Sequence, residues 1–213
     1  MQDHPLLIST IFEHAVKNYN KQEIVSNTVE GGIHRYTYFD WGKRTKKLAN
    51  AFKSLDLKES DRVGTLAWNG YRHLEIYYAT SSSGLVCHTI NPRLHPDQVS
   101  YIVNHAQDKV LCVDLNILPL VEKSSENFKT VKEIIIMTDN KNMVQPNIKD
   151  SIKVICYEDF IKDHSDQFDW PQMDERTASS LCYTSGTTGN PKGVLYSHPV
   201  SYTHLTLPTK RIV

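Results

Sequence analysis

The sequence lacks several features that would set its class at once. Its 24 basic and 24 acidic residues leave no net charge, which argues against a nucleic acid or an anionic membrane surface as the main partner. No apolar run approaches the roughly 18 residues of a membrane span. The N-terminus has no basic region followed by an apolar core, so we expect no secretory leader. The sequence therefore indicates a globular protein of the cytoplasm.

Cysteine and histidine give no sign of a disulfide framework or a metal centre. The four cysteines are Cys87, Cys112, Cys156 and Cys182. They lie far apart in apolar surroundings, so we expect buried, reduced thiols. The interior candidates among the ten histidines are His73, His88, His95 and His105. None has metal-site spacing, and individually hydrogen-bonded histidines are the favoured interpretation.

The main pattern present is an alternation of strands and helices. Apolar runs predict strands at 62–68, 85–90, 110–113 and 134–137, with helices at 73–83, 96–105 and 117–126 between them. A short strand at 154–156, a short helix at 158–162 and a further strand at 178–183 follow. This alternation predicts an α/β fold: a doubly wound, mostly parallel sheet with flanking helices.

The N-terminal part is expected to precede this sheet. It reads as a helix from Leu7 to Tyr19, then a hairpin around Gly31 and Gly32. A second helix follows, with Thr37 and Asp40 as a capping box and its end near Leu55. Its basic side holds Lys43, Arg44, Lys46 and Lys47. We interpret that side as the solvated face of an amphipathic helix rather than a nucleic-acid patch, because apolar residues line the other side.

One stretch near the C-terminus is rich in glycine and hydroxyl side chains. Residues 183–193 read Y-T-S-G-T-T-G-N-P-K-G and follow the strand predicted at 178–183. Glycines let a backbone approach a ligand closely, and successive N–H groups in such a turn form an anion-binding concavity. Lys192 adds a point charge that suits phosphate. The stretch predicts a loop that cradles a polyphosphate; its spacing is not that of a Walker A loop, and an ordinary hairpin turn is the alternative.

This stretch resembles the signature loop of the adenylate-forming superfamily, which includes acyl-CoA synthetases, luciferases and peptide-synthetase adenylation domains. Residues 72–75, 88–94 and 101–109 resemble the N-terminal region of medium- and long-chain fatty-acid–CoA ligases. The resemblance covers residues 1 to about 198. It implies the incomplete N-terminal domain of such an enzyme, which joins a carboxylic acid to coenzyme A in two steps and consumes ATP.

The resemblance also assigns roles to residues of the stretch. The β- and γ-phosphates of ATP would be bound by Thr184, Ser185, Gly186, Thr187, Thr188, Gly189 and Lys192. Thr184 would contact Mg²⁺, with a glutamate of the family's downstream part as its partner. The family's acyl pocket, adenine and ribose contacts and catalytic lysine also belong to that downstream part, so no catalytic residue is assigned. A homodimer is a further expectation from the family.

The end of the chain departs from the family pattern. Residues 199–213 have proline near both ends, a threonine-rich middle and no helical period. They resemble translated adapter or vector sequence joined to a truncated reading frame, and a divergent native tail is the alternative. We therefore expect two parts: residues 1–198, from the AMP-binding domain, and residues 199–213, a tail outside the family pattern.

Three functions remain open from the sequence. The leading one is an N-terminal fragment of an ATP-dependent fatty-acid–CoA ligase, which is an acid–thiol ligase, with the fragment itself inactive. The second is another nucleotide-binding phosphotransferase, against which the loop spacing speaks. The third is a non-catalytic homologue that binds a partner subunit.

Overall fold

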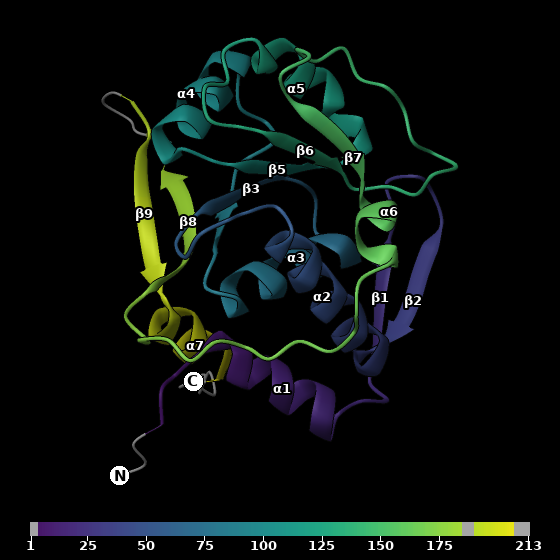
Figure 1. Ribbon diagram of the computed structural model, residues 1–213, viewed down its shortest axis with the longest axis vertical. Coiled ribbons are helices and arrows are strands. Elements are labelled where there is room, and N and C mark those ends of the chain that lie inside the picture. The colour runs from purple at the N-terminus through teal and green to yellow at the C-terminus, as the bar shows by residue number, and fades with distance from the viewer. Residues whose placement is uncertain (1–3, 185–189, 207–213) are drawn as a thin grey trace, which may run out of the picture.

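A seven-stranded sheet is the centre of the molecule (Figure 1). The computed structural model describes residues 4–184 and 190–206. In spatial order the strands are Lys153–Cys156 (β7), Glu133–Ile136 (β6), Val110–Val113 (β5), Arg62–Leu66 (β3), Val86–Thr89 (β4), Ala178–Thr184 (β8) and Lys192–Ser197 (β9). Neighbouring strands are parallel from β7 to β8, and β8 and β9 are antiparallel. The predicted mostly parallel α/β sheet is confirmed.

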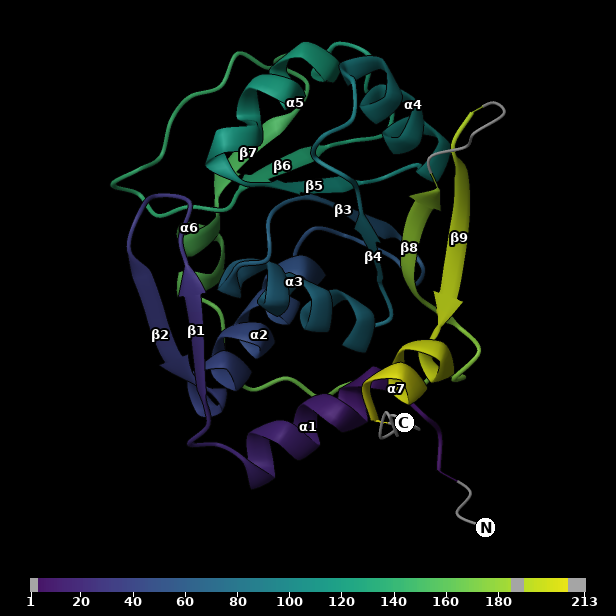
Figure 2. The same cartoon turned by 180° about the vertical axis from the view of Figure 1, so that it is seen from behind.

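Helices cover both faces of the sheet. One face carries Pro96–Ala106 (α4), the short 3₁₀ turn Leu115–Ile117 (η1) and Leu118–Ser125 (α5); the other carries Tyr38–Lys53 (α2), Tyr71–Ser82 (α3) and Tyr157–Lys162 (α6) (Figures 1 and 2). A separate apolar core fills each side. Phe52 and Ile76 belong to the core under α2 and α3, and Ile102 and Val121 to the core under α4 and α5. The sheet is therefore doubly wound, as the sequence predicted.

A two-stranded hairpin stands apart from the main sheet. Glu23–Asn27 (β1) and Ile33–Thr37 (β2) pair antiparallel. Gly31 and Gly32 have φ angles of 95° and 98° in its turn, a region that glycine adopts without strain. The capping box follows at once: the Asp40 N–H donates to Thr37 Oγ1 at 3.3 Å, and the Thr37 N–H donates to Asp40 Oδ2 at 3.0 Å. Both local predictions are confirmed.

The segment after β9 differs from its prediction. Its sequence shows no helical period and predicts no helix, yet His198–Thr206 forms one (α7). Proline fits a first helical turn because its missing N–H has no partner there in any case. The helix is anchored at its start: the N–H of Ile8, the first residue of helix Ile8–Asn18 (α1), donates to His198 Nδ1 at 3.2 Å. Figures 1 and 2 both show α7 beside α1.

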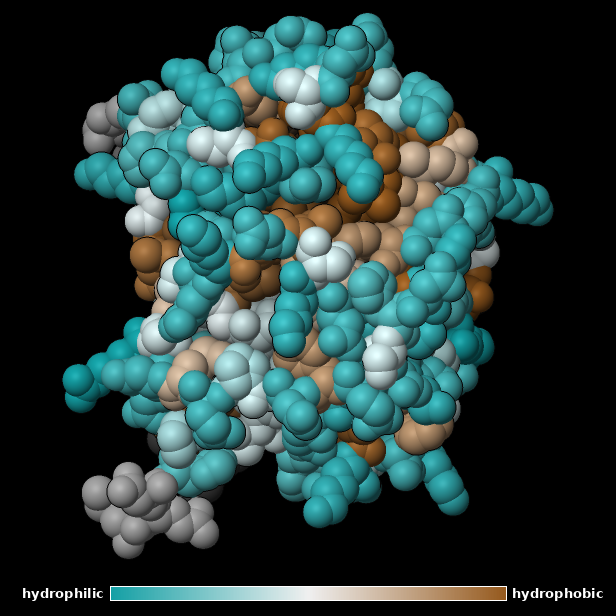
Figure 3. All heavy atoms as spheres, viewed as in Figure 1, coloured by the Kyte–Doolittle hydropathy of each residue, from teal (hydrophilic) through white to brown (hydrophobic). Residues whose placement is uncertain are grey.

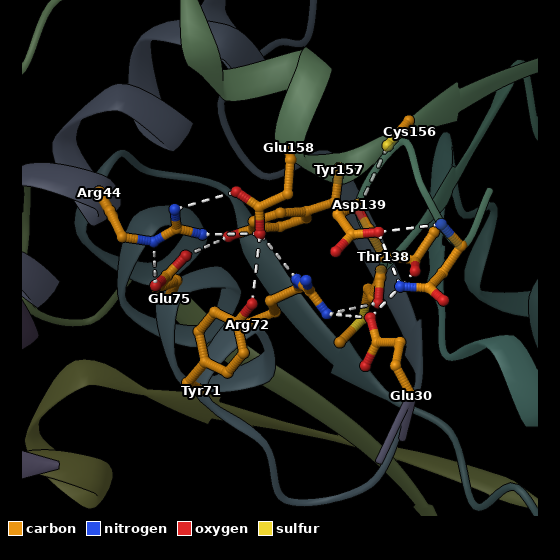
Figure 4. A network of polar contacts seen from close by, with 12 residues as sticks. Glu30, Arg44, Tyr71, Arg72, Glu75, Thr138, Asp139, Cys156, Tyr157 and Glu158 are labelled. Atoms are coloured by element: carbon orange, nitrogen blue, oxygen red, sulfur yellow. Dashed lines mark hydrogen bonds and ion pairs between the residues drawn. The ribbon is translucent and has the colours of Figure 1, made fainter. Parts of the chain in front are cut away.

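The interpretation of the basic side of α2 as a solvated face is wrong for Arg44. Its Nε donates to Glu75 Oε1 at 2.8 Å, and its two terminal nitrogens donate to the Glu158 carboxylate at 3.0 and 3.1 Å. Figure 4 shows the Arg44 guanidinium between these two acids. Lys43 remains on the exposed side. The pattern of apolar residues in α2 could not predict the burial of Arg44, because its partners belong to α3 and α6.

A second arginine extends this set of ion pairs. Arg72 donates from Nε to Glu158 Oε1 at 2.9 Å and from a terminal nitrogen to Glu30 Oε1 at 2.7 Å. Glu30 lies in the turn between β1 and β2, so the network ties the hairpin to the main body (Figure 4). Burial raises the pKa of Glu75 despite Arg44. For Glu158, burial is outweighed by hydrogen bonds and charge from both arginines, and its pKa is lowered.

Apolar side chains remain visible on part of the surface. In Figure 3 they gather over the region of β6 and β7, among side chains that are mostly hydrophilic elsewhere on this face. Val154 and Ile155 of β7 are half-buried and pack against the two cores. This end of the sheet is covered less completely than its centre.

We predict that Arg44→Ala destabilises the chain strongly. The substitution removes the ion-pair partner of the fully buried Glu75 and leaves it the Tyr157 hydroxyl, which donates to it at 2.6 Å. Removing one member of a buried ion pair typically costs about 3–5 kcal/mol. Urea denaturation should show this loss in the free energy of unfolding. Lys43→Ala, on the same helix, is the control and should change little, since its contact with Asp166 is a 3.8 Å surface pair. Equal effects of the two substitutions would contradict the prediction.

Candidate functional site

The glycine-rich stretch leaves the sheet at the carboxyl end of β8. Thr184 is the last residue of β8, and Lys192 is the first of β9. The two are paired in register, and the Thr184 hydroxyl donates to the Lys192 carbonyl at 3.5 Å. Both residues are exposed. The predicted site residues Ser185, Gly186, Thr187, Thr188 and Gly189 lie outside the described residues.

The flanking strands form an antiparallel hairpin, the arrangement that the sequence left open as an alternative. A hairpin does not conflict with phosphate binding here. Because β8 is parallel to β4, the hairpin connection leaves at the edge where the carboxyl ends of the parallel strands meet. Ligands of such sheets bind outside this edge. Thr184 offers a hydroxyl and Lys192 an ammonium group, and both donor types suit phosphate oxygens.

Strand β8 separates two different environments. Leu181 packs with Val86 and Ala106 on the side of α4. The Tyr183 hydroxyl is on the same side, 2.6 Å from His105 Nδ1, and Tyr183 also contributes to the lining of the cavity beside α3. Ser180 and Cys182 line a cavity on the side of α3. The alternation of side chains along the strand explains this division.

The cavity beside β8 has a volume of about 1020 Å³. Its floor includes Thr65 and Thr89 from the ends of β3 and β4, and Tyr77 and Tyr78 of α3 form part of its wall. His73 is also on the wall; its ring nitrogens lie 3.1 Å from the Trp68 carbonyl and 3.1 Å from Thr65 Oγ1. Burial lowers the pKa of His73, which favours the neutral ring. Aromatic walls with a few polar groups are typical of sites for small organic ligands.

The described residues offer little to a metal ion. Among them there is no group of three or more histidine, cysteine, aspartate or glutamate side chains placed to hold one. Thr184 supplies one hydroxyl oxygen, whereas Mg²⁺ sites in proteins normally include a carboxylate. The described part of the site therefore fits a phosphate better than a metal ion alone.

Each of the four candidate histidines makes its own hydrogen bonds, as the sequence indicated. Their expected interior position is wrong for two of them: His88 is buried and His73 half-buried, whereas His95 and His105 are exposed. His73 and His105 have the partners given above, and His95 Nδ1 accepts the Asp97 N–H at 3.4 Å at the start of α4. His88 Nδ1 lies 2.8 Å from both carboxylate oxygens of Asp108. The Asp108 partner was missed by sequence reasoning. Asp108 follows α4 by two residues and gives no local signal of its contact with β4.

The cysteines match their prediction with one difference. All four are free thiols, and Cys87, Cys112 and Cys156 are buried. Cys182 is half-buried, because it lies on the wall of the cavity. Burial raises the pKa of Cys87 to about 12. That thiol is thus protonated and unreactive near neutral pH.

A further acid lies where the strand order reverses, between β3 and β5. Asp114 directly follows β5, and its Oδ2 accepts the Trp68 N–H at 2.7 Å. Burial raises the pKa of Asp114 to about 6. The hollow beside it is small, with a volume of about 30 Å³. Sequence reasoning missed Asp114, although an acid directly after an apolar strand was a usable signal.

Fold and site together define a class: an α/β domain in which a Gly/Thr-rich segment leaves a strand at the carboxyl edge of a parallel sheet. The model of a family described as "AMP-binding enzyme" matches residues 12–209. The chain therefore belongs to the AMP-binding enzyme family of adenylate-forming ligases. The match extends past residue 198, and the origin of residues 199–213 stays a prediction.

Known relatives agree with this placement. The chain is 46% identical over 208 residues to a 3-methylmercaptopropionyl-CoA ligase of Ruegeria lacuscaerulensis, covering 96% of this chain and 37% of that protein. It is 44% identical over 204 residues to a medium-chain-fatty-acid–CoA ligase of Ectopseudomonas oleovorans, again over 96% of this chain and 37% of that protein. The chain thus spans little more than a third of the length of these relatives.

Solved structures show the same fold. An anthranilate CoA ligase in complex with anthranoyl-AMP superposes with a TM-score of 0.78 at 23% identity, over 93% of this chain and 36% of that one. This similarity supports the fold of the N-terminal region of such ligases. In residues 4–184 and 190–206, no helix combines the length and the apolar character that crossing a membrane requires.

We predict that Asp114→Asn changes how stability depends on pH. The pKa of Asp114 is raised from 3.8 to about 6 in the folded chain, so its contribution to stability is fully present below pH 3.8 and is lost as the pH rises through 6. An asparagine keeps an acceptor for the Trp68 N–H and does not ionise. The variant should therefore gain stability relative to wild type from pH 4 to 6, by up to about 3 kcal/mol.

Urea denaturation at several pH values measures this difference. Asp150→Asn, at an exposed position in the loop after β6, serves as the control for losing one carboxylate. A difference between Asp114→Asn and wild type that stays constant from pH 4 to 7 would show that the burial of Asp114 does not govern its titration.

Proposed function

We propose that this chain is the N-terminal part of an ATP-dependent fatty-acid–CoA ligase and that its β8–β9 connection binds the phosphates of ATP. The observation that carries the proposal is the position of residues 183–193. Their Gly/Thr-rich sequence joins two strands at the carboxyl edge of a parallel sheet, with Thr184 directly opposite Lys192. An α/β sheet binds its ligands at that edge.

The proposed reaction has two steps. The carboxylate of the acid attacks the α-phosphate of ATP, which gives an acyl-adenylate and releases pyrophosphate. The thiol of coenzyme A then attacks the acyl carbonyl and releases AMP. The first step needs little covalent chemistry from the protein, which mainly positions the reactants and balances charge on the phosphates.

The residues of the connection would divide this work. We propose that Thr184, Ser185, Gly186, Thr187, Thr188 and Gly189 bind the β- and γ-phosphates by backbone N–H groups and hydroxyls. The ammonium group of Lys192 would attract the same phosphates as a point charge. Thr184 would also contribute an oxygen to Mg²⁺. When bound, that ion neutralises phosphate charge.

Support for a fatty acid as the substrate class comes from the relatives. One relative is named as a medium-chain-fatty-acid–CoA ligase and another as a long-chain-fatty-acid–CoA ligase. Four free thiols suit the reducing cytoplasm, where we place the activity.

The complete reaction would belong to the whole ligase. Residues 1–213 span about 37% of the length of the relatives. We propose that they bind nucleotide without completing the reaction. Incubation of the 213 residues with octanoate, MgATP and labelled pyrophosphate tests this, and label exchange into ATP above background would refute it.

A second candidate function is a non-catalytic homologue that binds a partner chain. Strand β9 favours it, because β9 ends the seven-stranded order and Leu195 on it is 62% exposed. Co-purification of the chain with a longer ligase, lost on Leu195→Asp, would support this function. A second copy of the chain could occupy the same edge, and size-exclusion chromatography coupled to light scattering would detect that dimer.

We predict that Lys192→Gln weakens the binding of MgATP about tenfold. A charge-assisted hydrogen bond of the usual strength corresponds to an effect of this size. Isothermal titration of the 213-residue chain with MgATP gives the dissociation constants. Lys153→Gln is the matched control, because Lys153 begins β7 as Lys192 begins β9, at the opposite edge of the same sheet. No saturable binding by wild type, or equal binding by both variants, would reject the phosphate role.

A further inference from the structure

The end of the β8–β9 hairpin that is nearest to its connection extends beyond the rest of the sheet. Within the described residues, the ladder between β4 and β8 ends at the pair Thr89–Cys182. The hairpin continues for two more pairs, Tyr183 with Gly193 and Thr184 with Lys192. Most of β9 is exposed, and β8 is its one neighbour in the sheet. Backbone pairing to β4 therefore does not fix the position of Thr184 and Lys192.

The side chain of Tyr183 joins this end of the hairpin to the rest of the domain. Its hydroxyl and His105 Nδ1 on α4 are 2.6 Å apart. The centre of its ring is 5.3 Å from that of His88 on β4. The side chain thus connects the overhanging pair of strands to a helix and to a central strand.

Gly193 leaves room for this ring. It faces Tyr183 across the hairpin, and a Cβ on Gly193 would lie 3.1 Å from Tyr183 Cζ and 3.3 Å from the hydroxyl oxygen. Contacts this close oblige the neighbour to shift. The last glycine of the motif therefore has a packing role: it allows the tyrosine ring to lie against β9.

His88, one of the residues against which the Tyr183 ring packs, is held firmly in place. His88 and Asp108 are both fully buried, and Nδ1 of the histidine contacts both carboxylate oxygens. The Asp108 carbonyl also accepts the Thr130 hydroxyl at 2.8 Å. Nε2 of His88 is buried and has no hydrogen-bond partner among the described residues. A ring held in this way gives Tyr183 a fixed surface to pack against.

The protonation state of Tyr183 suits the hydrogen bond. Burial, followed by the charge of Asp108, raises the pKa of Tyr183 to about 12. The phenol therefore keeps its proton near neutral pH, and the neutral hydroxyl shares a hydrogen bond with His105 Nδ1.

We propose that Tyr183 is a positioning residue for nucleotide binding: by its contacts with His105, His88 and Gly193 it holds Thr184 and Lys192 where the phosphates of ATP bind. The proposal rests on the function proposed above. It adds a residue that touches no phosphate itself and acts through the two residues beside it in the hairpin.

The test compares Tyr183→Phe with wild type in the 213-residue chain. The substitution keeps the ring and removes the hydrogen bond to His105. Two readouts are needed: the dissociation constant for MgATP, and amide hydrogen exchange at Thr184 and Lys192. We expect MgATP to bind about three- to tenfold more weakly, the size expected from one typical hydrogen bond. Exchange at Thr184 and Lys192 should be faster, with unchanged exchange in β3 and β4.

Further variants separate positioning from a general loss of stability. Tyr101→Phe is the matched control, since Tyr101 lies on α4 and its ring stacks on His105 at 5.5 Å; it should bind MgATP as wild type does. His105→Ala should match Tyr183→Phe, and the double variant should lose no more than either single one. Gly193→Ala should show the same two effects through displacement of the ring.

The outcomes distinguish the two proposals. If wild type does not bind MgATP, the proposed function fails and the nucleotide role of Tyr183 fails with it. If wild type binds and Tyr183→Phe binds equally well, the positioning role alone is overturned. Additive losses in the double variant, or faster exchange spread evenly over the sheet, would also overturn it.

Discussion

The pairing of Glu75 with Arg44 is the constraint on which much of this structure depends. A carboxyl group removed entirely from water is costly unless it is paired and hydrogen-bonded. Glu75 meets this requirement through Arg44 and Tyr157, and Arg44 in turn requires Glu158. These residues come from α2, α3 and α6, so the three helices on one face of the sheet must dock together. Glu158 also binds Arg72, which in turn binds Glu30 of the N-terminal hairpin.

The candidate site is built in the opposite way. Its residues lie at the carboxyl edge of the sheet, beyond the last backbone pair between β4 and β8, and few of its groups are buried. Rigid packing on one side thus supports an exposed hairpin on the other. This division is common in α/β proteins, in which a stable scaffold carries loops that bind the ligand.

The sequence predicted the sheet because each buried strand is a short apolar run bounded by turn residues, and the helices between them have clear apolar faces. It predicted the location of the candidate site because the Gly/Thr-rich motif is local. It missed Asp108, Asp114 and the partners of Arg44, since those contacts join segments far apart in the chain. It also missed α7, whose start is fixed by a contact of His198 with α1 rather than by an apolar stripe of its own.

That contact of α7 has a consequence for the order in which the chain assembles. The Ile8 N–H and His198 Nδ1 are separated by 190 positions in the sequence. During synthesis the first turn of α1 must therefore wait for nearly the whole of this chain before its amide finds its partner. Contacts between residues so far apart in the sequence form slowly, because closing the long intervening loop costs conformational entropy. The amino end of α1 therefore depends on a contact that can form only after His198 has been synthesised.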